Sequence, residues 1–62
     1  YMPTIFVNIL EGKTQDQKDA LVKRITEAAV ETVDVVPEKV SVFITEYPKA
    51  NIARGGIMYD KQ

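Results

Sequence analysis

In residues 4–10 every second side chain is aliphatic, and this period of two is typical of a β-strand. One side of this segment is uniformly aliphatic and comprises Ile5, Val7 and Ile9. The other side mixes polar and apolar residues and comprises Thr4, Phe6, Asn8 and Leu10. Because both sides carry large apolar groups, the pattern predicts a strand that is covered on both faces.

Apolar residues then recur at helical spacing between residues 15 and 33, which predicts an amphipathic helix. Its apolar positions are Leu21, Val22, Ile25, Ala28, Ala29 and Val33. Thr14 precedes the helix and Gln17 follows three residues later, the spacing of a capping box at a helix start. Pro37 cannot continue a helix, so residues 34–38 are predicted to connect to the next element.

A second alternating segment predicts another strand. Val40, Val42 and Ile44 alternate there with Ser41, Phe43 and Thr45. A strand, a crossover helix and a strand form a right-handed parallel βαβ unit. Gly55-Gly56 indicates a short hairpin within residues 52–60. The sequence therefore predicts an α/β (α+β) fold in one domain over residues 1–62: a parallel strand pair, one amphipathic helix and a short C-terminal hairpin.

One helix can cover only one face of a two-stranded sheet. Phe6, Leu10 and Phe43 lie on the opposite face and need another cover. A chain of 62 residues buries only about 60% of its unfolded surface. It contains no cysteine, so no disulfide can compensate. These facts predict a homo-oligomer in which paired sheets cover one another.

Composition narrows the possible functions. Eight basic and nine acidic residues give a net charge of −1, which argues against a nucleic-acid partner. No apolar run is long enough to span a membrane, and we expect a cytoplasmic protein. The chain has no histidine and no cysteine, the commonest metal ligands and bases, so we expect neither a metal nor a cofactor.

Pro3 is the best candidate for a catalytic group in this composition. We expect Tyr1 to be an added residue and Met2 to be the original initiator, because natural reading frames start with Met. Removal of both would leave Pro3 with a free secondary amine, which can act as a base near neutral pH. The alternative is that Pro3 simply starts an edge strand, a position that tolerates proline.

Several short segments, each present once, follow one another along the chain at defined intervals. Pro3 starts the first strand, which runs into Ile9-Leu10-Glu11-Gly12-Lys13-Thr14 and is followed by Gln17-Lys18. Val42-Phe43-Ile44-Thr45-Glu46 and Gly55-Gly56 follow at matching intervals. In order and spacing these motifs resemble the 4-oxalocrotonate tautomerase family. The resemblance implies a βαβ subunit, a hexamer built as a trimer of dimers, and an N-terminal proline, here Pro3, that moves a proton between an enol oxygen and a carbon.

The resemblance also implies the substrate-binding positions. An arginine in the turn after the first strand corresponds to Lys13, which keeps the charge but not the bidentate fork. A second arginine corresponds to Ser41, which is uncharged, and an aromatic pocket wall corresponds to Ile52. Arg54 is the candidate to supply the cation that is lacking at Ser41. The alternatives are a solvated loop lysine at Lys13, a small packing residue at Ser41 and a surface ion-pair residue at Arg54.

We therefore expect a keto-enol isomerase that acts on a small carboxylate, either a 2-hydroxy-dienoate or a 2-keto acid. Its pockets are expected between subunits, so that Pro3 and its cations come from different chains. One alternative is a hydratase-like or dehalogenase-like relative that uses the same proline. The other is a non-catalytic oligomerisation domain of the same fold, which the uncharged Ser41 favours.

Overall fold

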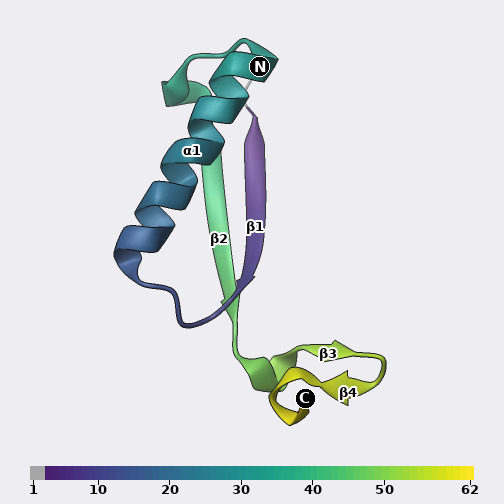
Figure 1. The fold of residues 1–62 in the computed structure, drawn as a ribbon. Coiled ribbons are helices and arrows are strands. Elements are labelled where there is room, and N and C mark those ends of the chain that lie inside the picture. The colour runs from purple at the N-terminus through teal and green to yellow at the C-terminus, as the bar shows by residue number, and fades with distance from the viewer. Residues whose placement is uncertain (1–2) are drawn as a thin grey trace.

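The structure, a computed structural model, describes residues 3–62 and confirms the predicted βαβ unit. Strand β1 (Thr4–Leu10) leads to helix α1 (Gln15–Val33), and the chain returns along strand β2 (Ser41–Tyr47) (Figure 1). The two strands are parallel, with Thr4 opposite Ser41 and Leu10 opposite Tyr47. The expectations for Tyr1 and Met2 lie outside the described residues.

Helix α1 begins at the predicted capping box. The backbone N–H of Gln17 donates to Thr14 Oγ1 (3.1 Å), and the N–H of Thr14 donates to Gln17 Oε1 (2.9 Å). The helix ends at Asp34, whose φ of 60° is left-handed and turns the chain back toward the sheet. A short 3-10 helix, η1 (Pro37–Lys39), follows, and the N–H of Val40 closes it by donating to the Pro37 carbonyl. Val40 therefore precedes β2 instead of starting it.

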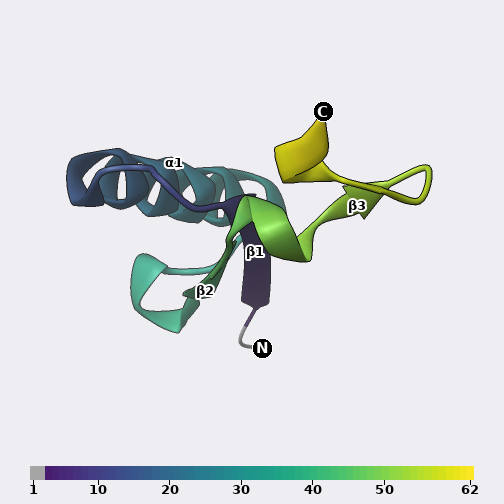
Figure 2. The same cartoon turned by 90° about the horizontal axis from the view of Figure 1, so that it is seen from below.

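The C-terminal segment forms the predicted hairpin beyond the end of β2. A 3-10 helix, η2 (Lys49–Asn51), leads to strands β3 (Ala53–Arg54) and β4 (Ile57–Met58), and a last turn, η3 (Tyr59–Lys61), follows. Gly55 and Gly56 have φ values of 64° and 83°, and a two-residue hairpin turn of this kind requires positive φ at both positions. The hairpin extends away from the helix and the strand pair (Figures 1 and 2).

The subunit has almost no interior of its own. Among the described residues only Ala29 is buried, and even Ala29 keeps 7% of its surface exposed. The radius of gyration is 14.7 Å, whereas a compact chain of this length has about 11 Å. The accessible surface is 4950 Å², against about 4,000 Å² for a compact monomer of this mass. The isolated subunit is therefore extended and exposes surface that a stable monomer would bury.

The face of the sheet opposite α1 carries two exposed aromatic side chains. Helix α1 lies along one side of the strand pair (Figure 2). On the other side Phe6 and Phe43 are 70% and 53% exposed, and their rings stack with centroids 5.4 Å apart. We call the side chains of this side, with Leu10 and Tyr47, the open face. The sequence predicted that Phe6, Leu10 and Phe43 would need cover from outside the subunit. The two phenylalanines are exposed as predicted, whereas Leu10 is already half-buried within the subunit.

Among residues 3–62 no helix is both long enough and apolar enough to cross a membrane.

Candidate functional site

Pro3 and Ser41 are neighbours at the start of the parallel strand pair. The N–H of Ser41 donates to the carbonyl oxygen of Pro3 with an N···O distance of 3.0 Å. Pro3 is half-buried, as is Ser41. This hydrogen bond extends the β1–β2 ladder by one residue and holds Pro3 at the edge of the sheet, where the chain enters β1. Pro3 therefore has a defined position at one end of the strand pair.

Lys13 lies at the opposite end of the sheet, in the loop between β1 and α1. Strand β1 has seven residues, so this loop is about 20 Å from Pro3. Lys13 lines a shallow cavity of about 260 Å³ together with Ile9, Gln17, Lys18 and Leu21. Two ammonium groups beside apolar walls suit a small carboxylate that also has a hydrocarbon part.

The two lysines of this cavity differ in their partners. Lys18 Nζ lies 3.0 Å from Glu46 Oε1, and the two side chains are 20% and 34% exposed. This is the one ion pair among residues 3–62. Lys13 is exposed and has no carboxylate partner in that part of the chain. Lys13 is therefore the ammonium that an incoming anion can use without displacing a protein carboxylate.

Ile52 and Arg54 belong to the hairpin beyond β2. Ile52 is half-buried, its N–H donates to the Lys49 carbonyl (3.3 Å), and its own carbonyl accepts from the Tyr59 N–H (2.6 Å). These two hydrogen bonds connect Ile52 to the turns before and after the hairpin. Arg54 is exposed on β3 opposite Ile57 and has no ion pair within residues 3–62. Both residues thus lie toward the Lys13 end of the molecule and far from Pro3.

The five predicted site residues form two separate groups in one subunit. Pro3 and Ser41 lie at one end of the strand pair, and Lys13, Ile52 and Arg54 lie at or beyond the other end. The molecule is 43 Å in its longest dimension, so no small substrate can contact both groups of a single chain. Residues of both groups could share one site only if they came from more than one subunit.

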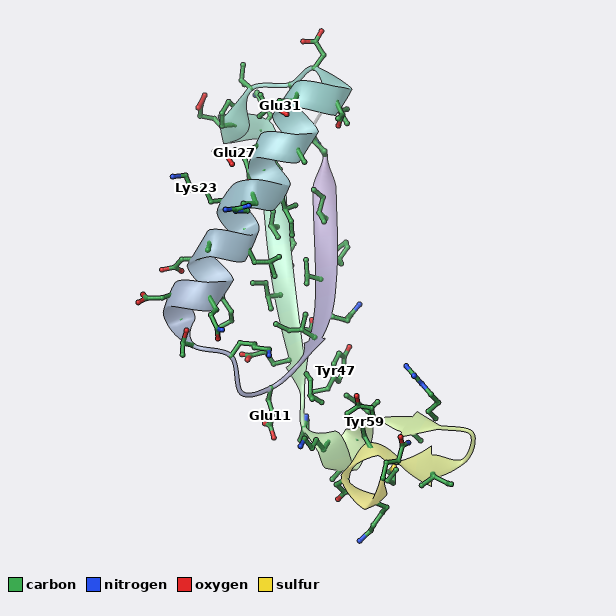
Figure 3. All side chains as sticks on the ribbon, viewed as in Figure 1. Glu11, Lys23, Glu27, Glu31, Tyr47 and Tyr59 are labelled. Carbon is green, nitrogen blue, oxygen red and sulfur yellow. The ribbon has the colours of Figure 1, made fainter. Side chains whose placement is uncertain are left out.

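Two polar contacts of the structure were not predicted. Tyr47 Oη donates to Asn8 Oδ1 (2.9 Å) across the strand pair, at the end of the open face near the hairpin. Tyr47 and Tyr59 both lie where the strand pair meets the C-terminal hairpin segment (Figure 3). Strand alternation already placed Asn8 and Tyr47 on the same side of the sheet, which was the available signal. The Lys18–Glu46 pair joins residues 28 apart and had no signal beyond opposite charge.

A further groove of about 380 Å³ lies between α1 and η1. Its apolar part is formed by Val22, Val30 and Pro37. Lys23, Glu27 and Glu31 border it from the outer side of the helix (Figure 3). Within residues 3–62 no three acidic side chains gather in a way that could hold a metal ion, here or elsewhere.

Comparisons with known proteins agree on one family. A family model described as tautomerase enzyme matches residues 3–62. A 2-hydroxymuconate tautomerase of Bacillus subtilis is 46% identical over 55 residues, which cover 89% of each chain. Another 2-hydroxymuconate tautomerase, from Pseudomonas sp. strain CF600, is 40% identical over 55 residues, covering 89% of this chain and 87% of that one.

Solved structures show the same similarity. A crystal structure of a 4-oxalocrotonate tautomerase homologue superimposes with a TM-score of 0.93 at 40% identity, covering 97% of this chain and 98% of that chain. A heterohexameric 4-oxalocrotonate tautomerase from Chloroflexus aurantiacus has a TM-score of 0.92 at 30% identity and covers 97% of both chains. The extended subunit with its terminal hairpin is thus a shape that these proteins share.

Proposed function

The chain belongs to the tautomerase family of isomerases, and on that premise we propose that it converts the enol form of a small 2-hydroxy-dienoate or 2-keto acid into its ketone. The observation that carries the proposal is the fixed place of Pro3 at the edge of the sheet, where its carbonyl is bonded to Ser41. Because only its carbonyl is used in that hydrogen bond, the ring nitrogen of Pro3 is available as a base once the residues before it are removed.

The role we assign to Pro3 is that of general base and general acid. A free α-amine has a reference pKa of about 7.7–8.0, and an apolar pocket or a nearby cation would lower the pKa of Pro3 further. The neutral amine takes the proton from the enol oxygen. The same amine, now protonated, delivers a proton to carbon as the double bond moves to form the ketone. A base with a pKa near ambient pH performs both steps efficiently.

The other four residues would bind the substrate. Lys13 is assigned to the carboxylate, because it is the cavity lysine without a carboxylate partner. Ile52 is assigned to the apolar wall, Ser41 to the pocket lining beside Pro3, and Arg54 to polarisation of the carbonyl. If Arg54→Ala left both turnover and substrate affinity unchanged, that last assignment would be withdrawn.

We propose that these residues meet between subunits. Strand β1 pairs only with β2 within the described residues, so its other edge is open. A second copy packed antiparallel along that edge would bring its Lys13 loop beside Pro3 of the first copy. The exposed open face would then pack against other dimers, as a trimer of dimers requires. The small interior of the subunit and the hexameric relative both support a hexamer.

The test is an ultraviolet assay of enol-to-ketone conversion with 2-hydroxymuconate and with an aryl enol acid. Protein that begins at Pro3 is compared with the chain that begins at Tyr1, after mass spectrometry has confirmed both N-termini. We expect activity only in the first, because an acylated proline nitrogen is not basic. Pro3→Ala in the shortened protein tests whether the secondary amine itself is needed.

Two outcomes would overturn the proposal. Equal activity in both proteins would exclude the amine mechanism. Silence in both, with an intact oligomer, would favour the non-catalytic assembly domain that the uncharged Ser41 suggests.

A further inference from the structure

The basic side chains are distributed unevenly over the subunit. Helix α1 has no basic residue in its last turn, which lies at the Pro3 end of the sheet. Lys13, Lys49, Arg54 and Lys61 lie at or beyond the opposite end, and Lys18, Lys23 and Arg24 lie along the first part of the helix. Lys39, at the end of η1, is the one basic residue that residues 3–62 place at the Pro3 end.

Backbone hydrogen bonds connect Lys39 to Pro3. The N–H groups of Lys39 and Val40 donate to Val36 and Pro37 and close η1, and the next N–H, that of Ser41, donates to Pro3. Val40 is extended, with φ −94° and ψ 124°, so the Cα atoms of Lys39 and Ser41 are at most about 7 Å apart. The flexible four-carbon stem of lysine then allows its ammonium to reach the surroundings of Pro3.

The charge around Pro3 is otherwise acidic or neutral. Glu31, Asp34 and Glu38 lie at the same end of the subunit, and Ser41 is uncharged. The C-terminal end of α1 also presents the negative end of its dipole there. A carboxylate that approaches this end of a single subunit therefore meets one positive charge, that of Lys39, among three carboxylates. Lys39 is exposed and has no ion pair within residues 3–62, so it is available to such a carboxylate.

We propose that Lys39 is a substrate-binding residue that attracts the carboxylate and enol oxygen of the substrate to Pro3. The inference rests on the proposed function and narrows its substrate class. A 2-hydroxy enol acid carries its carboxylate on the carbon that bears the enol oxygen, so Lys39 can contact both groups beside Pro3, in addition to the Lys13 and Arg54 that a neighbouring subunit is proposed to supply. The cation stabilises the charge that develops on that oxygen when Pro3 removes its proton. Acids with this one carboxylate are then sufficient substrates, and a second carboxylate is not required.

The experiment compares Lys39→Gln, Lys39→Arg and the matched control Lys23→Gln in protein that begins at Pro3. Lys23 is also exposed and also lacks an ion pair within residues 3–62, so both glutamine variants lose one equivalent positive charge. Kinetics are measured with an aryl enol acid that has one carboxylate and with its methyl ester. Circular dichroism and sedimentation check that all variants keep the fold and assembly.

We expect Lys39→Gln to lower kcat/KM for the acid about tenfold, less than the 10²–10³-fold loss for a buried oxyanion donor, because solvent screens an exposed lysine. The loss should be smaller for the ester, and Lys39→Arg should retain most activity. The pH-rate profile of Lys39→Gln should move to higher pH, because loss of a nearby cation raises the pKa of the Pro3 amine.

Lys39→Gln kinetics within twofold of Lys23→Gln, for both substrates and across pH, would overturn the inference. That result is distinguishable from failure of the proposed function. In the latter case the unsubstituted protein that begins at Pro3 would itself be inactive, or Pro3→Ala would retain its activity. A change in sedimentation confined to Lys39→Gln would assign Lys39 to the assembly and would equally refute substrate binding.

Discussion

The open face of the sheet leads to a quantitative prediction about assembly. Phe6 is the most exposed large apolar side chain of the described residues, at 70%. It stacks on Phe43 in its own subunit and has no cover from α1. If this face is where subunits meet, Phe6→Ala should weaken the oligomer while leaving the βαβ unit folded in the same way.

The expected magnitude follows from the exposed area. A phenylalanine side chain has about 200 Å² of surface, so the exposed part of Phe6 amounts to about 140 Å². Covering it in an interface contributes about 3.5 kcal/mol per subunit at 25 cal/mol per Å². Because alanine keeps only the Cβ contact, Phe6→Ala should cost about 3 kcal/mol per subunit. Such a loss corresponds to about a hundredfold weaker association for each contact.

The assay is sedimentation velocity or native mass spectrometry over a dilution series. Phe6→Ala is compared with the parent chain and with Val36→Ala. Val36 is 53% exposed but lies in the α1–η1 connection, away from the open face. We expect the Phe6 variant to dissociate at protein concentrations at least a hundredfold higher than the parent does, and the control variant to behave like the parent.

Two results would refute this reasoning. Phe6→Ala could keep the parent's stoichiometry and dissociation range, which would mean that the open face remains uncovered in the oligomer. Alternatively, Val36→Ala could dissociate as readily as Phe6→Ala, which would mean that general apolar loss and not this face controls assembly.

Three further predictions concern single residues. Thr14→Ala removes the hydroxyl that accepts from the Gln17 N–H and should lower the free energy of unfolding by about 1 kcal/mol per subunit in urea titrations at fixed concentration; an unchanged midpoint would show that this hydrogen bond does not contribute. Asp34→Gly should raise the thermal midpoint, because glycine adopts the left-handed conformation without the cost of about 1 kcal/mol that a side chain imposes, and a fall would mean that the Asp34 carboxylate has a role of its own. Lys13→Gln should raise KM for carboxylate substrates about tenfold, in line with 1.5–3 kcal/mol for hydrogen bonds to charged groups, while Lys13→Arg keeps KM; equal KM values in all three proteins would contradict carboxylate binding.

The local elements could be predicted because their causes are local. The alternation of residues 4–10 and the box formed by Thr14 and Gln17 specify a strand and a helix start within a few residues, and the structure has both as predicted. Gly55-Gly56 likewise specified a hairpin, because side chains are disfavoured at two successive positive φ angles. The second strand was predicted to start one residue too early, at Val40. In the structure the N–H of Val40 closes the 3-10 turn at Pro37–Lys39, and the strand starts at Ser41.

The relations between distant residues needed the tertiary structure. Alternation could assign Asn8 and Tyr47 to one side of the sheet, but their hydrogen bond depends on the parallel register of β1 and β2. The pairing of Lys18 with Glu46 depends on where α1 lies over β2. This pairing gives Lys18 a carboxylate partner that Lys13 lacks among residues 3–62, a difference that no pattern of charges along the chain could predict.

The sequence by itself determined the type and order of the elements and the apolar character of the open face, and it made Pro3 the candidate catalytic group. Each of these depends on residue chemistry or short-range periodicity. Only the tertiary structure decided that Pro3 and Lys13 lie at opposite ends of β1, and that Lys39 is the one basic residue near Pro3 among residues 3–62. The physical reason is that the crossover helix returns the chain to the start of the sheet. Residues 39 and 41 thereby come beside residue 3, while residue 13, much closer to Pro3 in sequence, is left about 20 Å away.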